Sequence, residues 1–220
     1  MRAVLLDALG TLVELERPWP HLVAELGARG VAIDEADARR AMLAEMAYYR
    51  ANHDDASDRS GLADLRRRCA EVVRAELGTG LPVDEVQAAM LAAIRFRPYP
   101  EVPGVLAALR ERGCALVVVS NWDVSLHDVL EQTRLRELVD AVVTSAEFGA
   151  AKPDPAIFAH ALELAGGVPA AEALHAGDDL AADVEGARAA GIAAVLVARD
   201  GERPPPGVRA VATLEALISG

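Results

Sequence analysis

The sequence predicts an α/β fold in which a parallel central sheet carries an inserted all-helical domain. Short apolar runs recur along the chain without alternating polar residues, as expected of strands buried on both faces of a parallel sheet. Most of these runs are followed by apolar residues three or four positions apart, which is the period of a helix. Between Val13 and Arg97 the helical period continues and no convincing strand is found. This stretch therefore predicts a helical insertion.

The first strand is expected at Val4–Leu6, an apolar run that ends in Asp7. Gly10 and Thr11 follow at once, and glycine lets the backbone turn sharply there. A carboxylate at the carboxyl end of a buried strand lies where open α/β sheets bind their ligands. An aspartate in this place is also a common turn residue, so it does not establish a site by itself.

The composition excludes several classes of partner. The chain has 220 residues, with 34 Asp and Glu against 22 Lys and Arg, and a formal net charge of −12. This charge disfavours nucleic acid and anionic membranes as partners. Aromatic residues make up 4% of the chain, which leaves few side chains for stacking on bases. A small anionic substrate would need a local cation in order to bind.

Cysteine use and hydropathy favour a cytoplasmic protein. The two cysteines, Cys69 and Cys114, are isolated and fit reduced, buried thiols. The first apolar run breaks at Asp7, so we expect no secretory leader. No stretch approaches 18 apolar residues, so we expect no membrane span. We expect the assembly to be a monomer or a homodimer.

The insertion is expected to hold about four helices, with prolines at both borders that suit hinge-like connections. Asp34 and Asp84 stand where helix N-caps belong. The richest polar cluster is the segment 48–55, which is either a solvated helix end or an edge that faces substrate. In the second interpretation Arg50 and His53 offer charge and hydrogen bonds to a substrate.

Further strands are expected at residues 115–119, 141–144, 173–176, 193–197 and 208–211. The first of these ends in Ser120 and Asn121, which can donate to an anionic group, although serine is equally common as a helix N-cap. Lys152 follows the second, just before a helix start at Asp154–Pro155. A lysine in this place is usually a surface residue. Beside several carboxylates and a phosphate it would instead be the counter-cation.

Three aspartates follow the strand at 173–176. Asp178 and Asp179 come directly after it, and Asp183 lies about one helical turn further on. Acidic residues in a first helical turn commonly complement the helix dipole. Directly after a strand they are also placed to hold a hard cation through oxygen ligands.

Taken together, four segments resemble the motifs of the haloacid dehalogenase superfamily of hydrolases. They are DALGTL at 7–12, VVVSN ending at 121, AKPDP at 151–155 and GDDLAAD at 177–183. Their order and spacing cover nearly the whole chain. The resemblance implies a Rossmann-like three-layer sandwich formed by residues 1–13 and 98–220. It also implies that residues 14–97 are an all-helical cap domain of the subfamily I type.

The resemblance further implies a role for each matching residue. Asp7 would attack the substrate and form a covalent intermediate, an aspartyl phosphate in phosphatases, that water then breaks. Ser120 would bind the transferring group, and Lys152 would neutralise it and orient Asp7. The expected substrate-binding residues are Ser120, Asn121, Thr11, Arg50 and His53, with Asp55 as a further cap candidate.

The resemblance also implies Mg²⁺ as the cofactor. Asp7, Asp178 and the backbone carbonyl of Leu9 would be its ligands, and Asp183 would support them from the second shell. Leu9 itself departs from the phosphatase pattern, which usually has a second aspartate at this position as general acid and base. Leucine cannot transfer protons, and loss of such a group is worth about 10²–10⁴-fold in rate.

Leu9 leaves three possibilities open. Water and a good leaving group suffice, another residue such as His53 supplies the proton, or the reaction is not phosphoester hydrolysis. Haloacid dehalogenases of the family also lack the second aspartate, and they use no metal. Asp178 argues against that activity, because two carboxylates ~4 Å apart repel by about 4 kcal/mol at an effective dielectric of about 20 unless a cation lies between them.

We therefore expect a Mg²⁺-dependent phosphatase that acts on a small phosphorylated metabolite. A metal-independent 2-haloacid dehalogenase with Asp7 as nucleophile is the first alternative. A protein of low activity, or one that only binds phosphate and Mg²⁺, is the second.

Overall fold

The computed structural model describes residues 1–199, 201 and 204–219. It divides into two compact units, one formed by Met1–Glu14 with Arg97–Gly220 and the other by Leu15–Phe96. The chain thus leaves the first unit after one strand and returns to it about eighty residues later. Each unit is described by itself.

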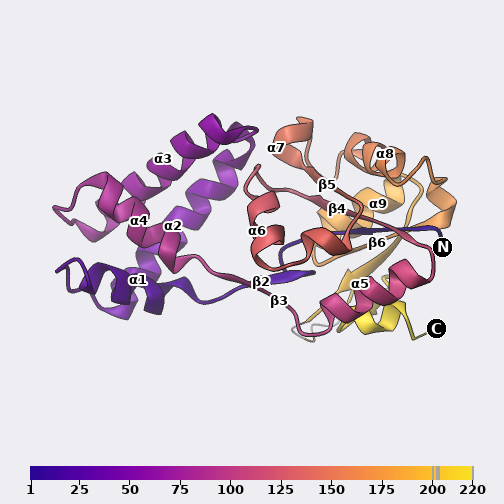
Figure 1. Cartoon of the computed structure of the whole chain (residues 1–220), viewed down its shortest axis with the longest axis horizontal. Coiled ribbons are helices and arrows are strands. Elements are labelled where there is room, and N and C mark those ends of the chain that lie inside the picture. The colour runs from indigo at the N-terminus through magenta and orange to yellow at the C-terminus, as the bar shows by residue number, and fades with distance from the viewer. Residues whose placement is uncertain (200, 202–203, 220) are drawn as a thin grey trace. The chain divides into compact units, whose positions relative to one another are not determined.

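The first unit is built on a six-stranded sheet with the strand order β5-β4-β1-β6-β7-β8 (Figure 1). All registered neighbours in this sheet run parallel. The strands are β1 (Ala3–Leu6), β4 (Ala115–Ser120), β5 (Ala141–Thr144), β6 (Ala173–Gly177), β7 (Ala193–Val197) and β8 (Ala210–Val211). The predicted Rossmann-like α/β fold with a parallel central sheet is confirmed.

Helices cover both faces of this sheet. They are α5 (Val102–Glu111), α6 (Leu126–Gln132), α7 (Ser145–Phe148), α8 (Pro155–Leu164) and α9 (Gly186–Ala189). Apolar residues of α8 and α9, among them Phe158 and Ala187, pack in one cluster with Leu5 and Val117 of the sheet. Helix α5 lies on the opposite side, against β4 (Figure 1). Burial of apolar side chains on both faces explains why the strands show no alternation of polar residues.

The position of β1 between β4 and β6 decides where the chemistry gathers. Every residue of β1 is fully buried, and Leu6 pairs with Val118 on one side and Ala176 on the other. Because parallel strands end at the same edge, the segments that follow β1, β4 and β6 lie side by side. Asp7 and Asp178 belong to these segments, and Ser120 is the last residue of β4.

The second unit contains four α-helices over residues that are all described. They are α1 (Pro18–Gly27), α2 (Glu35–Asn52), α3 (Arg59–Leu77) and α4 (Val83–Ala93), with a 3₁₀ turn at His53–Asp55. Helix α2 packs against α3, α3 against α4, and α1 against α2 and α4. None of the described helices is long and apolar enough to cross a membrane.

Two details of the insertion differ from the sequence prediction. Short strands β2 (Val13–Leu15) and β3 (Phe96–Pro98) pair where no strand was expected, because three residues are too few to show a period. Asp34 caps α2 by accepting the amide of Asp37 at 2.7 Å, as predicted. Asp84, by contrast, lies inside the first turn of α4, whose N-cap is Pro82. Proline, with its fixed φ, starts this helix before the aspartate is reached.

Glu45 is a buried carboxylic acid inside the second unit. It lies on the packed face of α2, is 5% exposed, and shares a hydrogen bond with Cys69 of α3. Burial raises the pKa of Glu45 to about 7, although the bond to Cys69 opposes the shift. The folded chain therefore holds a proton on Glu45 at a pH where the unfolded chain has already lost it.

This shift predicts that the fold loses stability as the pH rises from about 4.5 to about 7, because the folded state binds the extra proton. The contribution is at most about 3 kcal/mol. Urea unfolding at pH 5 and pH 8 measures it. In Glu45→Gln, which keeps the shape without the charge, the difference between the two pH values should shrink by that amount. Equal pH dependence in both proteins would contradict the expectation.

Candidate active site

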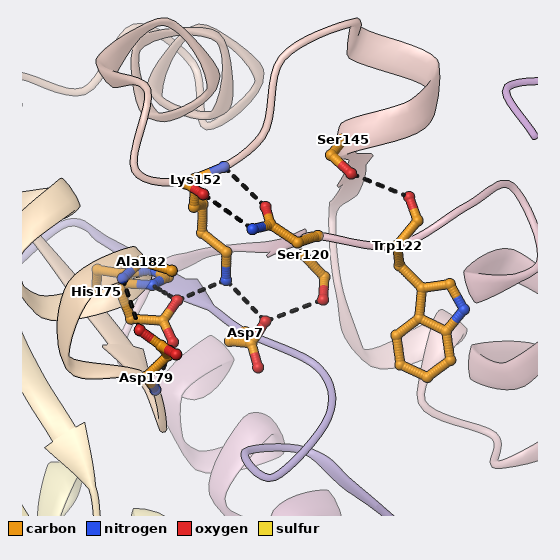
Figure 2. A network of polar contacts seen from close by, with 10 residues as sticks. Asp7, Ser120, Trp122, Ser145, Lys152, His175, Asp179 and Ala182 are labelled. Atoms are coloured by element: carbon orange, nitrogen blue, oxygen red, sulfur yellow. Dashed lines mark hydrogen bonds and ion pairs between the residues drawn. The ribbon is translucent and has the colours of Figure 1, made fainter. Parts of the chain in front are cut away.

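Lys152 joins two buried carboxylates at the carboxyl edge of the sheet (Figure 2). Its Nζ donates to Oδ1 of Asp7 at 2.7 Å and to Oδ1 of Asp183 at 2.5 Å. Ser120, the last residue of β4, donates its hydroxyl to the same Asp7 oxygen at 2.9 Å. All four side chains are buried. The structure thus brings together Asp7, Ser120, Lys152 and Asp183 from four separate segments of the chain.

The charges in this group stabilise one another. Burial disfavours the ammonium, but the two adjacent carboxylates prevail and raise the pKa of Lys152. Burial likewise opposes ionisation of Asp183, yet Lys152 and His175 hold the pKa of that carboxyl well below its usual range. For Asp7, burial raises the pKa, while Lys152 and Ser120 counteract it. The ionised carboxylate of Asp7 therefore depends on the cation beside it.

Asn121 holds the backbone of Lys152. Its side-chain Nδ2 donates to the Lys152 carbonyl at 2.9 Å, and its Oδ1 accepts the Lys152 amide at 2.7 Å. Both ends of the amide thus fix the loop that carries the lysine. A role of Asn121 in binding substrate stays a prediction, as does that of Thr11, whose Oγ1 is buried and has no hydrogen-bond partner among the described residues.

His175 is a site residue that the sequence prediction missed. It lies in β6, fully buried, with Nε2 2.9 Å from Oδ1 of Asp183 and its ring nearly perpendicular to the ring of Phe158. Since Asp183 accepts, Nε2 carries the proton. The signal was present: a polar side chain inside an otherwise apolar strand needs a buried partner. Only the structure identifies that partner.

The three aspartates after β6 have three different tasks. Asp179 caps the π-helical turn Leu180–Glu185 by accepting the amides of Ala181 and Ala182. Asp183 turns inward to Lys152. Asp178 is exposed, and ligand oxygens of Asp7, Asp178 and Asp183 lie within 4.8 Å of one another.

The turn after Asp7 is closely fitted to Asp178. Gly10 has a φ of +78°, and a Cβ at that position would lie 2.0 Å from Oδ2 of Asp178. Only glycine satisfies both the positive φ and the close approach. Loss of hydration on burial raises the pKa of Asp178 to about 7, and repulsion from Asp7 and Asp183 is the second, smaller cause. The positive charge of Lys152 opposes this shift but does not cancel it.

The predicted cap residues lie in the second unit. Arg50 is exposed, and its carbonyl is 3.1 Å from Nδ1 of His53. Asp55 pairs with Arg68 at 2.9 Å, and Arg68 also donates to the hydroxyl of Tyr48. Their roles toward a substrate stay predictions.

A sequence model of the haloacid dehalogenase-like hydrolases matches residues 1–191. The chain belongs to this hydrolase family. The hydrolase is 31% identical to haloacid dehalogenase-like hydrolase domain-containing protein 3 of Mus musculus, over 90% of this chain and 82% of the mouse protein. It is 40% identical to phosphatase MT3486 of Mycobacterium tuberculosis over 56% of either chain. A match to the Bos taurus counterpart of the mouse protein, 50% identical over 42% of this chain, spans 37% of that protein's length.

Solved structures show the same fold over the whole chain. The hydrolase superposes on a phosphatase of the family from Thermococcus onnurineus with a TM-score of 0.66 and 28% identity, covering 99% of this chain and 96% of the other. It also superposes on a defluorinating L-2-haloacid dehalogenase with a TM-score of 0.76 and 23% identity, covering 99% and 93%. The second similarity shows the fold alone.

Lys152 is the only lysine in the sequence, and all the other residues among the 22 Lys and Arg are arginines. This makes its charge directly measurable by NMR. Protein labelled with ¹³C-lysine gives a single resonance for Cε, the carbon bonded to Nζ. We expect that resonance to titrate well above the usual lysine range, because Asp7 and Asp183 favour the ammonium.

Asp183→Asn removes one of the two carboxylates and should lower the pH at the midpoint of the Lys152 titration. Asp154→Asn, at the exposed N-cap of α8, is the matched control and should leave this midpoint unchanged. A wild-type midpoint at or below the usual lysine value would contradict the ion triad.

Proposed function

We propose that the hydrolase is a Mg²⁺-dependent phosphatase that acts on a small phosphorylated metabolite through a covalent intermediate on Asp7. The observation that carries this proposal is the proximity of Asp178 to Asp7, whose ligand oxygens lie within 4.8 Å of each other, while the Lys152 ammonium bonds to Asp7 and Asp183. Phosphatase is also the activity named for two of the similar proteins.

The residues present suit a hard divalent cation. Carboxylate and carbonyl oxygens are the ligands that Mg²⁺ prefers, and the cluster supplies Asp7 and Asp178, with the Leu9 carbonyl as the third protein ligand. Asp183 would support the cluster from behind through Lys152. Burial and the neighbouring carboxylates raise the pKa of Asp178, and a cation bound there would offset this repulsion. When bound, Mg²⁺ would neutralise these carboxylates and the phosphoryl oxygens.

The reaction then divides into two displacements at phosphorus. An oxygen of Asp7 forms a bond to phosphorus while the bond to the substrate's alcohol oxygen breaks, which gives an aspartyl phosphate. Lys152 and Ser120 orient Asp7 and donate to the transferring group. Water next attacks the same phosphorus, which frees inorganic phosphate and restores Asp7. The departing alkoxide takes its proton from water, because Leu9 has none to give.

Residues 15–96 fit the role of a cap that selects the substrate. Such a unit excludes water and contacts the part of the substrate that does not react. Arg50 and His53 are the proposed contacts.

Leu9 favours a second candidate, a 2-haloacid dehalogenase. In that reaction Asp7 would displace halide from carbon and water would break the resulting ester. Asp178 disfavours it, because a metal-free site would leave an uncompensated carboxylate next to the nucleophile.

The two candidates differ in an assay with and without metal. We expect release of phosphate from p-nitrophenyl phosphate and small sugar phosphates, lost in EDTA and restored by Mg²⁺. Asp7→Asn should abolish it, and Asp178→Asn should raise the half-saturating Mg²⁺ concentration by about tenfold or more. Phosphate release that persists in EDTA would reject the Mg²⁺ dependence. Halide release from 2-chloropropionate without metal, with no release of phosphate, would reject the phosphatase in favour of the second candidate.

Leu9 predicts an unusual dependence on the leaving group. Without a general acid, kcat should fall steeply as the pKa of the departing alcohol rises, since the alkoxide leaves unprotonated. A series of aryl and alkyl phosphates measures the slope. Leu9→Asp should flatten it and raise the rate with alkyl phosphates by about 10²-fold. Leu9→Asn is the control, because asparagine has the shape of aspartate but cannot act as a general acid. A flat slope in the wild type would show that another group already protonates the alcohol.

A further inference from the structure

Arg199, which follows β7, contacts two separate segments of the first unit. Its Nε donates to the Gly10 carbonyl at 3.0 Å and its Nη2 to the Thr11 carbonyl at 2.6 Å. Its Nη1 donates to Oε1 of Glu101 at 2.7 Å, and its guanidinium carbon lies 3.4 Å from the centroid of the Tyr99 ring. The ion pair with Glu101 is largely enclosed, with 15% and 11% of the two side chains exposed.

The two carbonyls belong to the turn that leads away from the nucleophile. Within this turn the amides of Leu12 and Val13 bond to the carbonyl of Ala8, and the amide of Gly10 bonds to that of Val13. The carbonyls of Gly10 and Thr11 are left for partners outside the turn, and Arg199 supplies both. The backbone amide of Tyr99 takes the next carbonyl, that of Leu12, at 3.1 Å.

The same turn sets the space beside Asp178. Gly10 lies against the Asp178 carboxylate. A shift of the Gly10 carbonyl would therefore move the backbone of residues 8–10, which connects Asp7 to this contact. The Leu9 carbonyl lies in this segment as well. A donor that fixes the carbonyls of Gly10 and Thr11 therefore fixes the spacing of the acidic cluster.

We propose that Arg199, held by Glu101 and Tyr99, is a positioning residue that keeps the turn after Asp7 in the geometry needed for metal binding and attack. The planar guanidinium is suited to this task because its N–H groups point in fixed directions, which a lysine ammonium cannot reproduce. Glu101 fixes the plane from one edge and the Tyr99 ring from one face. The inference rests on the proposed function only for its catalytic readout.

The first test needs no substrate or metal. In Arg199→Lys, hydrogen exchange of the Gly10, Leu12 and Val13 amides should speed up by about tenfold or more, while amides of β1 and β6 keep their rates. Glu101→Gln keeps an acceptor but removes the charge, and should give a smaller change of the same pattern. Arg188→Lys is the matched control, since Arg188 is exposed and donates to the Gly207 carbonyl, away from this turn.

The second test measures the site itself. In Arg199→Lys the half-saturating Mg²⁺ concentration, and the Mg²⁺ dissociation constant from calorimetry, should rise by about tenfold. For p-nitrophenyl phosphate kcat should fall by about 10- to 100-fold, with KM changed less than about twofold. Arg188→Lys should match the wild type in both measurements.

Two outcomes would overturn the proposal. One is unchanged exchange in residues 10–13 of both Arg199→Lys and Glu101→Gln. The other is faster exchange spread evenly over the whole sheet with kcat and Mg²⁺ affinity retained, which would mean that Arg199 only stabilises the fold. A wild type without phosphatase activity would reject the proposed function instead, and the exchange of residues 10–13 would still decide the role of Arg199.

Discussion

A lysine ammonium buried between two carboxylates is the constraint on which the rest of the structure depends. Removing one member of such a group leaves an uncompensated buried charge, which typically costs about 3–5 kcal/mol. Asp7, Lys152 and Asp183 must therefore be held together by their surroundings. The parallel sheet brings their segments to one edge, and Asn121 and His175 fix the lysine loop and the second carboxylate.

This arrangement gives Asp7 two unlike sides. On one side Lys152 and Ser120 both donate to Oδ1, in surroundings closed to solvent. On the other side Asp178 is open to solvent, and Leu9 is 40% exposed. The closed side keeps the carboxylate ionised and oriented. The open side carries the negative charge of Asp178, and it is the side on which we propose that a cation and a substrate bind.

The sequence was most informative where topology alone brings residues together. Polar residues at strand ends must meet at one edge of a parallel sheet, so the neighbourhood of Asp7, Ser120 and Asp178 could be anticipated, as could the fold itself. Pairings that depend on side-chain direction could not be. Nothing in the sequence says that the amide of Asn121 turns to the lysine loop, that His175 finds Asp183, or that Arg199 reaches back almost 190 positions to Gly10.

The strand order has a consequence for how the chain acquires its fold. β1 is synthesised first, yet its neighbours β4 and β6 begin at residues 115 and 173. During synthesis β1 must wait, wholly apolar and unpaired, while the helices of residues 15–96 have only local contacts to make and can form early. The inserted unit can thus fold before the sheet of the first unit is complete. The edge of the sheet that holds Asp7, Ser120 and Asp178 is assembled later, when the segment that follows β6 has left the ribosome.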